Sequence, residues 1–300
     1  IEGFIYGIMA LGVFITFRIL DFPDMTVDGS FPMGAVIIAA MIVSGFHFTV
    51  ALFVAFLAGM LAGTVTALIH IKLKVNNLLA GILTLTMLYS VNIRILGNKA
   101  NQPLLNQHTV KTWVENVTGG IIDPQIALVI FFFLVILVIK ILMDIFFHTD
   151  MGLAMTSMGD NPKMVINLGI NDSTMKIIGV SMANGMVALS GGFAAMYLGF
   201  GDINLGQGII VSGLASVMIG EFILRGSSIY IKTLRVVIGC IIYKAVMYLG
   251  REYGYDFGLT PNDLKLVTGL MLIGCLALTR FPIGKKRVKG VPNGSTEGAA

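Results

Sequence analysis

Five polar side chains interrupt otherwise apolar stretches of this 300-residue sequence, and their chemistry could serve a function. They are Asp28, Ser30, Asn184, Asn204 and Gln207. Carboxylate, hydroxyl and amide groups bind solutes through hydrogen bonds, and polar groups within apolar spans mark the route of a solute or an ion. We therefore expect these residues to line a path through an apolar bundle.

Two of these residues have a structural alternative. Asn184 lies among glycines in 180–192 (VSMANGMVALSGG) and could form an interhelical hydrogen bond instead. Asp28 precedes Gly-Ser-Phe-Pro and could cap a helix, because carboxylates are favourable at helix N-termini. Both alternatives stay open at this level.

A second candidate lies in the longest internal loop, 148–174. Asn161 and Pro162 suit the start of a helix, and 163–168 would make about two turns. Gly169 can adopt the left-handed conformation that ends a helix. The loop therefore predicts a short helix between two spans, which is either an ordinary amphipathic connector or a knob that docks into a cytoplasmic partner.

The residues after this short helix predict where the next long one begins. Asn171 and the three residues after it offer caps for a helix that starts at Met175.

These residues must be positioned by membrane-spanning helices. Hydrophobic residues make up 56% of the chain and charged residues 12%, and the mean hydropathy is +0.89. A chain with so few charges cannot cover a water-facing surface. Because about 20 apolar residues span a bilayer, the sequence predicts an all-α polytopic bundle of about nine spans, at 1–20, 32–46, 50–70, 78–96, 122–146, 174–199, 205–224, 234–250 and 263–281.

The basic residues set the orientation. With the C-terminal tail inside, 13 Lys and Arg residues lie on the inner side and 5 on the outer side, as the positive-inside rule requires. Lys140 and Lys244 fall inside spans, and Lys244 must pair or reach the interface. Glu221 is expected to pair with Arg225, four residues later on the same helix face.

Two spans have interrupted beginnings that resemble each other. DMTVDGSFPMGAVIIAA leads into the second span and GDINLGQGIIVSGLASV into the seventh, and the two run in opposite directions. Inverted repeats with paired, interrupted helices place a transport path at the repeat interface. Two glycine-rich spans could also resemble each other through composition alone.

The sequence lacks the signatures of several other functions. The sequence has no Gly-x-x-x-x-Gly-Lys-Ser/Thr phosphate loop, and its four histidines lack the spacing of metal ligands. We see no cluster of His, Asp or Glu at one membrane depth, as a membrane enzyme would need. The basic residues lie in short loops and the tail, so no nucleic acid partner is implied.

Segment 149–171 (TDMGLAMTSMGDNPKMVINLGIN) makes a resemblance specific. It resembles the coupling-helix region of the branched-chain amino acid and ribose type permeases of bacterial ABC importers, which Gly159, Asn161, Gly169, Ile170 and Asn171 match. Segment 24–34 (DMTVDGSFPMG) also resembles the corresponding segment of this family, and is most similar to the branch assigned to tryptophan and tyrosine transport. The resemblance covers about residues 5–282.

The resemblance implies the rest of a transport machine in the bacterial inner membrane. Two permease subunits, by default a homodimer, would enclose the path, and an external solute-binding lipoprotein would deliver a small solute, with amino acids favoured. Cytoplasmic ATPase subunits would carry ATP-Mg and grip the coupling residues, so this chain would bind no cofactor and catalyse no reaction. Those residues would be Gly159, Asp160, Asn161, Pro162, Lys163, Gly169, Ile170 and Asn171.

The expected organisation is a permease domain over 1–282, with a coupling helix at about 159–171, and a disordered cytoplasmic tail over 283–300. The alternative is a stand-alone secondary transporter driven by an ion gradient. Such a protein would be expected to place ionisable residues at mid-membrane, and in the sequence only Lys244 clearly lies there.

Overall fold

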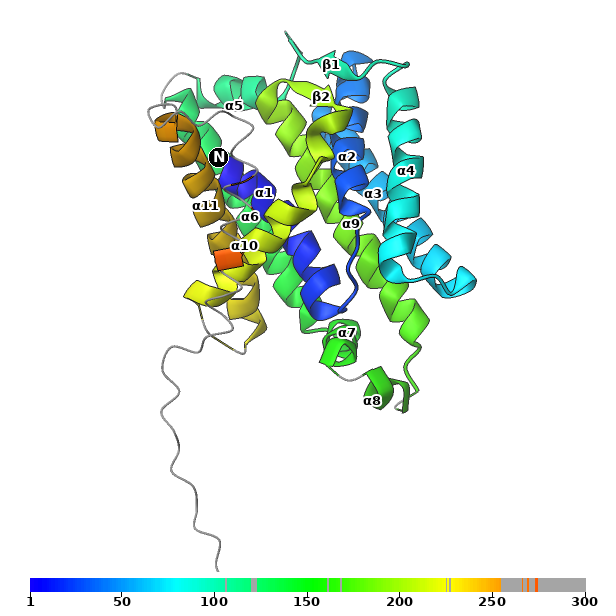
Figure 1. The fold of residues 1–300 in the computed structure, drawn as a ribbon. Helices are drawn as coiled ribbons and strands as arrows, with labels where there is room; N and C mark the ends of the chain where they lie inside the picture. Colours follow the sequence, from blue (N-terminus) through cyan, green and yellow to red (C-terminus); the bar gives the residue numbers. More distant parts are fainter. Residues whose placement is uncertain are drawn as a thin grey trace, which may run out of the picture.

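The structure is a computed structural model that describes residues 1–105, 107–119, 123–160, 162–167, 169–224, 226, 228–254 and the single positions 266, 269, 273 and 274. It is a bundle of long helices, as predicted, with short elements at both ends (Figure 1). The helices are α1 (Glu2–Phe14), continued by the π-helical turn η1 (Ile15–Ile19), α2 (Val27–Val43), α3 (Phe48–Leu73), α4 (Asn77–Ile95), α5 (Val110–Thr118), α6 (Pro124–Phe147), α7 (Asp150–Asp160), α8 (Pro162–Asn167), α9 (Asp172–Leu198), the 3₁₀ turn η2 (Ile203–Gly206), α10 (Ile209–Ile223) and α11 (Ile229–Gly254).

The described residues hold seven helices long and apolar enough to cross a membrane, together with the shorter apolar helix α2. These correspond to eight of the predicted segments, and the all-α polytopic class is confirmed. The ninth segment, 263–281, lies outside the described residues except for four positions. The predicted tail 283–300 also lies outside them.

Several helices begin where a short polar side chain accepts one of their first free N–H groups. Asn76 Oδ1 accepts from Leu78 N at 3.0 Å before α4, and Asp123 Oδ1 accepts from Gln125 N at 2.9 Å before α6. Such caps replace the intrahelical partners that a first turn lacks.

Helix α9 forms the centre of the bundle. Helices α1, α2 and α3 pack against it, and 78% of its most apolar 18-residue window is buried. By contrast, α3, α4 and α6 expose large apolar side chains such as Phe53, Leu61 and Leu142. Such outward faces suit contact with lipid, which does not need polar coverage.

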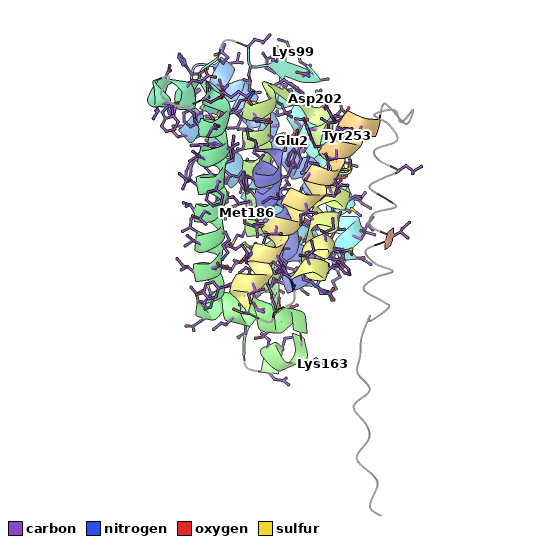
Figure 2. The ribbon with its side chains drawn as sticks, turned by 90° about the vertical axis from the view of Figure 1, so that its left-hand side faces the viewer. Glu2, Lys99, Lys163, Met186, Asp202 and Tyr253 are labelled. Atoms are coloured by element: carbon purple, nitrogen blue, oxygen red, sulfur yellow. The ribbon has the colours of Figure 1, made fainter. Side chains whose placement is uncertain are left out.

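The two ends of the bundle differ. One end carries α5 and a two-stranded antiparallel sheet of β1 (Asn101–Pro103) and β2 (Phe200–Asp202), whereas α7 and α8 lie at the other (Figure 1). Figure 2 shows Lys163 of α8 at the end opposite Lys99 and Asp202. The predicted internal loop, 148–174, therefore lies at the end opposite the small sheet. The small sheet was not predicted, because its three-residue strands are far apart in the sequence.

Two expectations about charged residues have clear outcomes. Lys244 is paired, because its Nζ lies 3.3 Å from Glu2 Oε2 and 3.2 Å from the centroid of the Tyr6 ring. Arg225, the expected partner of Glu221, lies outside the described residues. Among the described residues, Glu221 contacts two other arginines, Arg18 and Arg235.

Candidate translocation site and coupling segment

The two interrupted spans begin beside each other inside the bundle. Asp28, in the first turn of α2, accepts from the N–H groups of α10: Oδ1 from Ile210 N at 2.8 Å and Oδ2 from Gly208 N at 3.2 Å. The chain before α10 crosses this turn at Gly206, where an added Cβ would fall on the carbonyl oxygen of Asp28. That carbonyl lacks its usual helical partner because Pro32 has no N–H. We call residues 24–30 and 202–210 the half-helix junction.

The two halves of the junction share a local geometry. Asp24 Oδ1 accepts from Thr26 N at 2.9 Å, and Asp202 Oδ1 accepts from Asn204 N at 2.7 Å. In each turn an aspartate therefore satisfies the N–H two residues later, just before a helix starts. The helices that follow run in opposite directions (Figure 1). This agreement favours the predicted inverted repeat over a likeness of composition alone.

Ser30 and Asn184 belong to a closed network in this conformation. Asn184 Oδ1 accepts from Ser30 Oγ at 2.6 Å, and Asn184 Nδ2 donates to Asp24 Oδ2 at 2.6 Å. All three side chains are buried. The network ties α2 and the segment before it to α9, as the interhelical alternative for Asn184 requires. That Ser30 and Asn184 also line a path stays a prediction.

Asp24 was not a candidate from the sequence. It is a buried carboxylate in the segment between η1 and α2, an ionisable group that hydropathy alone did not single out. The sequence did offer a sign of it: Asp24 occupies the same place in the segment before the second span as Asp202 occupies in the segment before the seventh. Asn92 lies on α4 within a predicted span, so the rule that polar groups within apolar spans mark a path would have found it.

Asp28, Asn204 and Gln207 lie on the open side of the junction. Asn204 and Gln207 are exposed and paired, with Gln207 Nε2 donating to Asn204 Oδ1 at 3.2 Å, and Asp28 is half-buried. Close by, Asn92 Nδ2 donates to Gly29 O at 3.3 Å, while its buried Oδ1 has no partner among the described residues. The junction thus presents amides and a carboxylate next to the starts of two helices, which could hydrogen-bond a polar solute.

The predicted coupling segment is helical on both sides of residue 161. Helix α8 ends at Asn167, and Gly169 has a φ of +82°, as predicted for a helix end. Asn171 Oδ1 accepts from Ser173 N at 3.0 Å and Thr174 N at 3.4 Å. Asn171 therefore caps α9, and the predicted start at Met175 was wrong: α9 begins at Asp172, because Asn171 itself is the cap.

The structure describes only some of the other residues predicted for coupling. Lys163 is exposed, and Ile170 N donates to Val165 O at 3.3 Å. Asn161 lies outside the described residues, as do the side chains of Asp160 and Pro162. Helix α7 (Asp150–Asp160) was missed, although Thr149 offers a cap for it: Thr149 Oγ1 accepts from Gly152 N at 3.3 Å.

Asn184→Ala is expected to destabilise the fold by about 1–3 kcal/mol, because the buried Asp24 Oδ2 would lose the amide that donates to it and Ser30 Oγ would keep only Thr26 O as a partner. The measurement is the unfolding midpoint of the purified protein in detergent. Ser44→Ala is the control, since the exposed Ser44 hydroxyl bonds only within its own helix end. Equal midpoints for the two variants would contradict the assignment of a stabilising network.

Comparison with known proteins adds two relatives and one family. The sequence profile of the family described as "Branched-chain amino acid transport system / permease component" matches residues 1–276. A "Tyrosine transport system permease protein" of Clostridioides difficile (strain R20291) is 40% identical over 286 residues, which are 95% of this chain and 92% of the relative. An uncharacterized protein of Rickettsia prowazekii (strain Madrid E) is 30% identical over 265 residues, 88% of this chain and 90% of the relative. No solved structure matches.

Proposed function

The chain belongs to the branched-chain amino acid transport system permease family, and from this premise we propose that it is the membrane-spanning subunit of an ABC importer in the bacterial inner membrane. It is a multi-pass membrane protein and the permease component of a transport system. The proposal adds the source of energy, the partners and the solute. ATP is hydrolysed by partner subunits, and this chain supplies the path and the segment on which they act.

The observation that carries the proposal is the coupling segment. Helices α7 and α8 lie outside the spans at the end opposite β1 and β2 (Figure 1). Gly169 and Asn171 end one helix and begin the next, so this end of the bundle leads directly into α9. A cytoplasmic ATPase that moves this segment can rock the central helix, and with it one group of helices against the other.

The half-helix junction supports a path between two copies of the chain. Asn204 and Gln207 are exposed at the start of α10, and Asp28 is only half-buried. Amide and carboxylate groups at membrane depth are costly against lipid, so they face protein or a water-filled route. A second copy of this chain, related by a twofold axis, would cover them and leave a polar route between the subunits.

The proposed solute is tyrosine or a related aromatic amino acid. The support is the Clostridioides relative, whose name states tyrosine transport and whose likeness covers 95% of this chain. An amino acid carries both charges and several hydrogen-bond groups, which the carboxylate and amides of the junction could accommodate in passing. An external solute-binding lipoprotein would select the solute and deliver it to the end that carries α5, β1 and β2.

Purification and reconstitution test this proposal. The tagged chain is expected to co-purify with an ATPase subunit in equal amounts. Vesicles that contain both, supplied with the solute-binding protein, should accumulate labelled tyrosine only when ATP is present. A chain that purifies alone and takes up its solute on a proton or sodium gradient without ATP would refute the proposal in favour of a secondary transporter.

A further inference from the structure

The last turn of the first span is a π-helix at the end of the bundle that carries the coupling segment. Over Ile15–Ile19 the chain widens from α-helical to π-helical geometry, and Leu20 N donates to Ile15 O at 3.0 Å. Single π-helical turns are rare and occur often at functional sites. Two independent sets of contacts converge on this turn.

The first contact joins the turn to the coupling segment. Gly159, near the end of α7, lies so close to the turn that an added Cβ would fall on the carbonyl oxygen of Ile19. Leu20 in turn packs on Gly179 of α9, together with Met155 of α7. Backbone-to-backbone contact leaves no flexible side chain between the two segments, so a displacement of α7 at this point must displace the turn.

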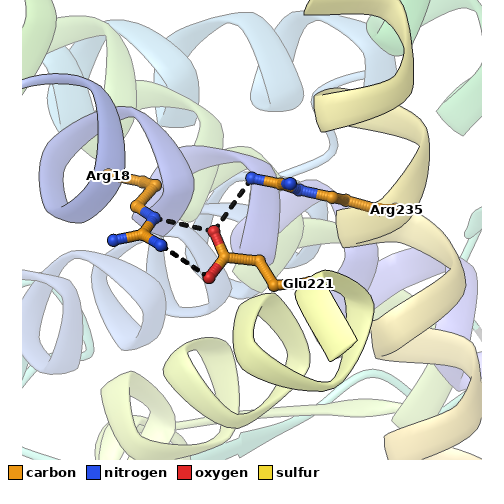
Figure 3. A network of polar contacts seen from close by, with 3 residues as sticks. All are labelled: Arg18, Glu221 and Arg235. Atoms are coloured by element: carbon orange, nitrogen blue, oxygen red, sulfur yellow. Dashed lines mark hydrogen bonds and ion pairs between the residues drawn. The ribbon is translucent and has the colours of Figure 1, made fainter. Parts of the chain in front are cut away.

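The second contact joins the same turn to α10 and α11 through Glu221 (Figure 3). Arg18 donates to both carboxylate oxygens, from Nε to Oε1 at 2.7 Å and from Nη2 to Oε2 at 2.8 Å. Arg235 Nη2 of α11 donates to Oε1 at 2.9 Å. Bidentate pairing of an arginine with a carboxylate fixes the relative orientation of the two groups as well as their distance.

The exposed fractions of the two arginine side chains show which of them depends more on Glu221. The Arg18 side chain is 56% exposed and can be solvated without its partner, whereas the Arg235 side chain is 11% exposed. Arg235 Nε is buried and lacks a partner within the described part of the chain. Glu221 is therefore the anion that both arginines share, and Gly220 beside it packs on the backbone of Arg235.

We propose that the π-helical turn Ile15–Ile19 is the joint that passes movement of the coupling segment to α10 and α11, with Glu221 as the residue that positions this joint. The inference rests on the proposed function. Movement of α7 acts on Ile19 through Gly159, and Arg18 carries it to Glu221 and Arg235. The start of α10 lies in the half-helix junction, so the same movement reaches Asp28 at the opposite end of that helix.

Glu221→Gln tests this role, because it keeps the shape of the side chain but removes the shared charge. The readout is solute transported per ATP hydrolysed in reconstituted vesicles, which a merely structural role would not change. We expect the ratio to fall at least tenfold, the ATPase to stay bound, and Glu221→Asp to recover part of the loss. Asp172→Asn is the matched control, because it removes the Lys176–Asp172 pair at the same end of the bundle (2.8 Å), and its ratio should equal that of the wild type.

Arg18→Gln covers the case in which Glu221→Gln does not fold. Arg18 is half-exposed, and its removal leaves the Glu221–Arg235 pair in place, so the bundle should fold and the ratio should still fall. A coupling ratio within twofold of the wild type in Arg18→Gln would overturn the inference. If the wild-type complex itself shows no ATP-driven uptake, the proposed function fails, and the two failures are thereby distinguished.

Discussion

Gly34→Val is expected to abolish stable folding of the bundle. At Gly34 the backbone of α2 touches that of α9, and an added Cβ would fall on the carbonyl oxygen of Ala188. Close approach through small residues is how membrane helices associate. Gly191 of α9 makes the reciprocal contact with the carbonyl oxygen of Phe31, so a larger side chain at Gly34 can be accommodated only if the two helices move apart.

The cost should exceed that of ordinary overpacking, which is about 1–3 kcal/mol. Separating α2 from α9 also stretches the Ser30–Asn184 hydrogen bond of 2.6 Å and so disturbs Asp24. The measurement is the yield of monodisperse protein in detergent and its unfolding midpoint. Ala40→Val is the control, because Ala40 lies on α2 at a partly exposed position. A Gly34→Val midpoint within about 2 °C of the wild type would show that this contact is not needed.

Gly159→Val is expected to abolish ATP-driven uptake while the spans stay folded. The added side chain would collide with the carbonyl oxygen of Ile19 and push α7 off the π-helical turn. Gly159 lies outside the spans, so the unfolding midpoint should change little. The loss of uptake should exceed tenfold, measured in vesicles that hold equal amounts of wild-type or variant complex.

Ser157→Val provides the matched control for that experiment. It adds similar bulk to the same helix two residues earlier, at an exposed position whose hydroxyl bonds only within α7. Its uptake should resemble that of the wild type. Equal uptake by both valine variants would remove the contact between α7 and the turn from the mechanism.

Much of the fold could be predicted because it depends on local properties. Apolar runs of about 20 residues must form helices in a membrane, where each backbone group needs an internal partner. Polar residues between the apolar runs marked several helix boundaries, and Gly169 was correctly identified as a helix end. The two segments before α2 and α10 were recognised as interrupted beginnings because aspartates and glycines stand there among apolar residues.

The pairings across the bundle could not be predicted in the same way. Spacing within one helix suggested Arg225 as the partner of Glu221, because only an i,i+4 neighbour is visible in a sequence. Arg225 lies outside the described residues, and among those described Glu221 pairs with Arg18 and Arg235. The first of these lies on the first span, 203 residues away along the chain. No rule of local spacing covers such a distance.

The candidate site was likewise predicted only in part: its residues could be named from the sequence, but their contacts could not. Residue type and apolar context alone pointed to Asp28, Ser30, Asn184, Asn204 and Gln207. Tertiary structure decided that Ser30 and Asn184 are enclosed with Asp24, and that Asp28 accepts from the first N–H groups of α10. The sequence by itself thus determined which segments are helical and which residues are polar within them. Which of those residues meet depends on how helices far apart in the chain pack, and that is decided only when their backbones come into contact.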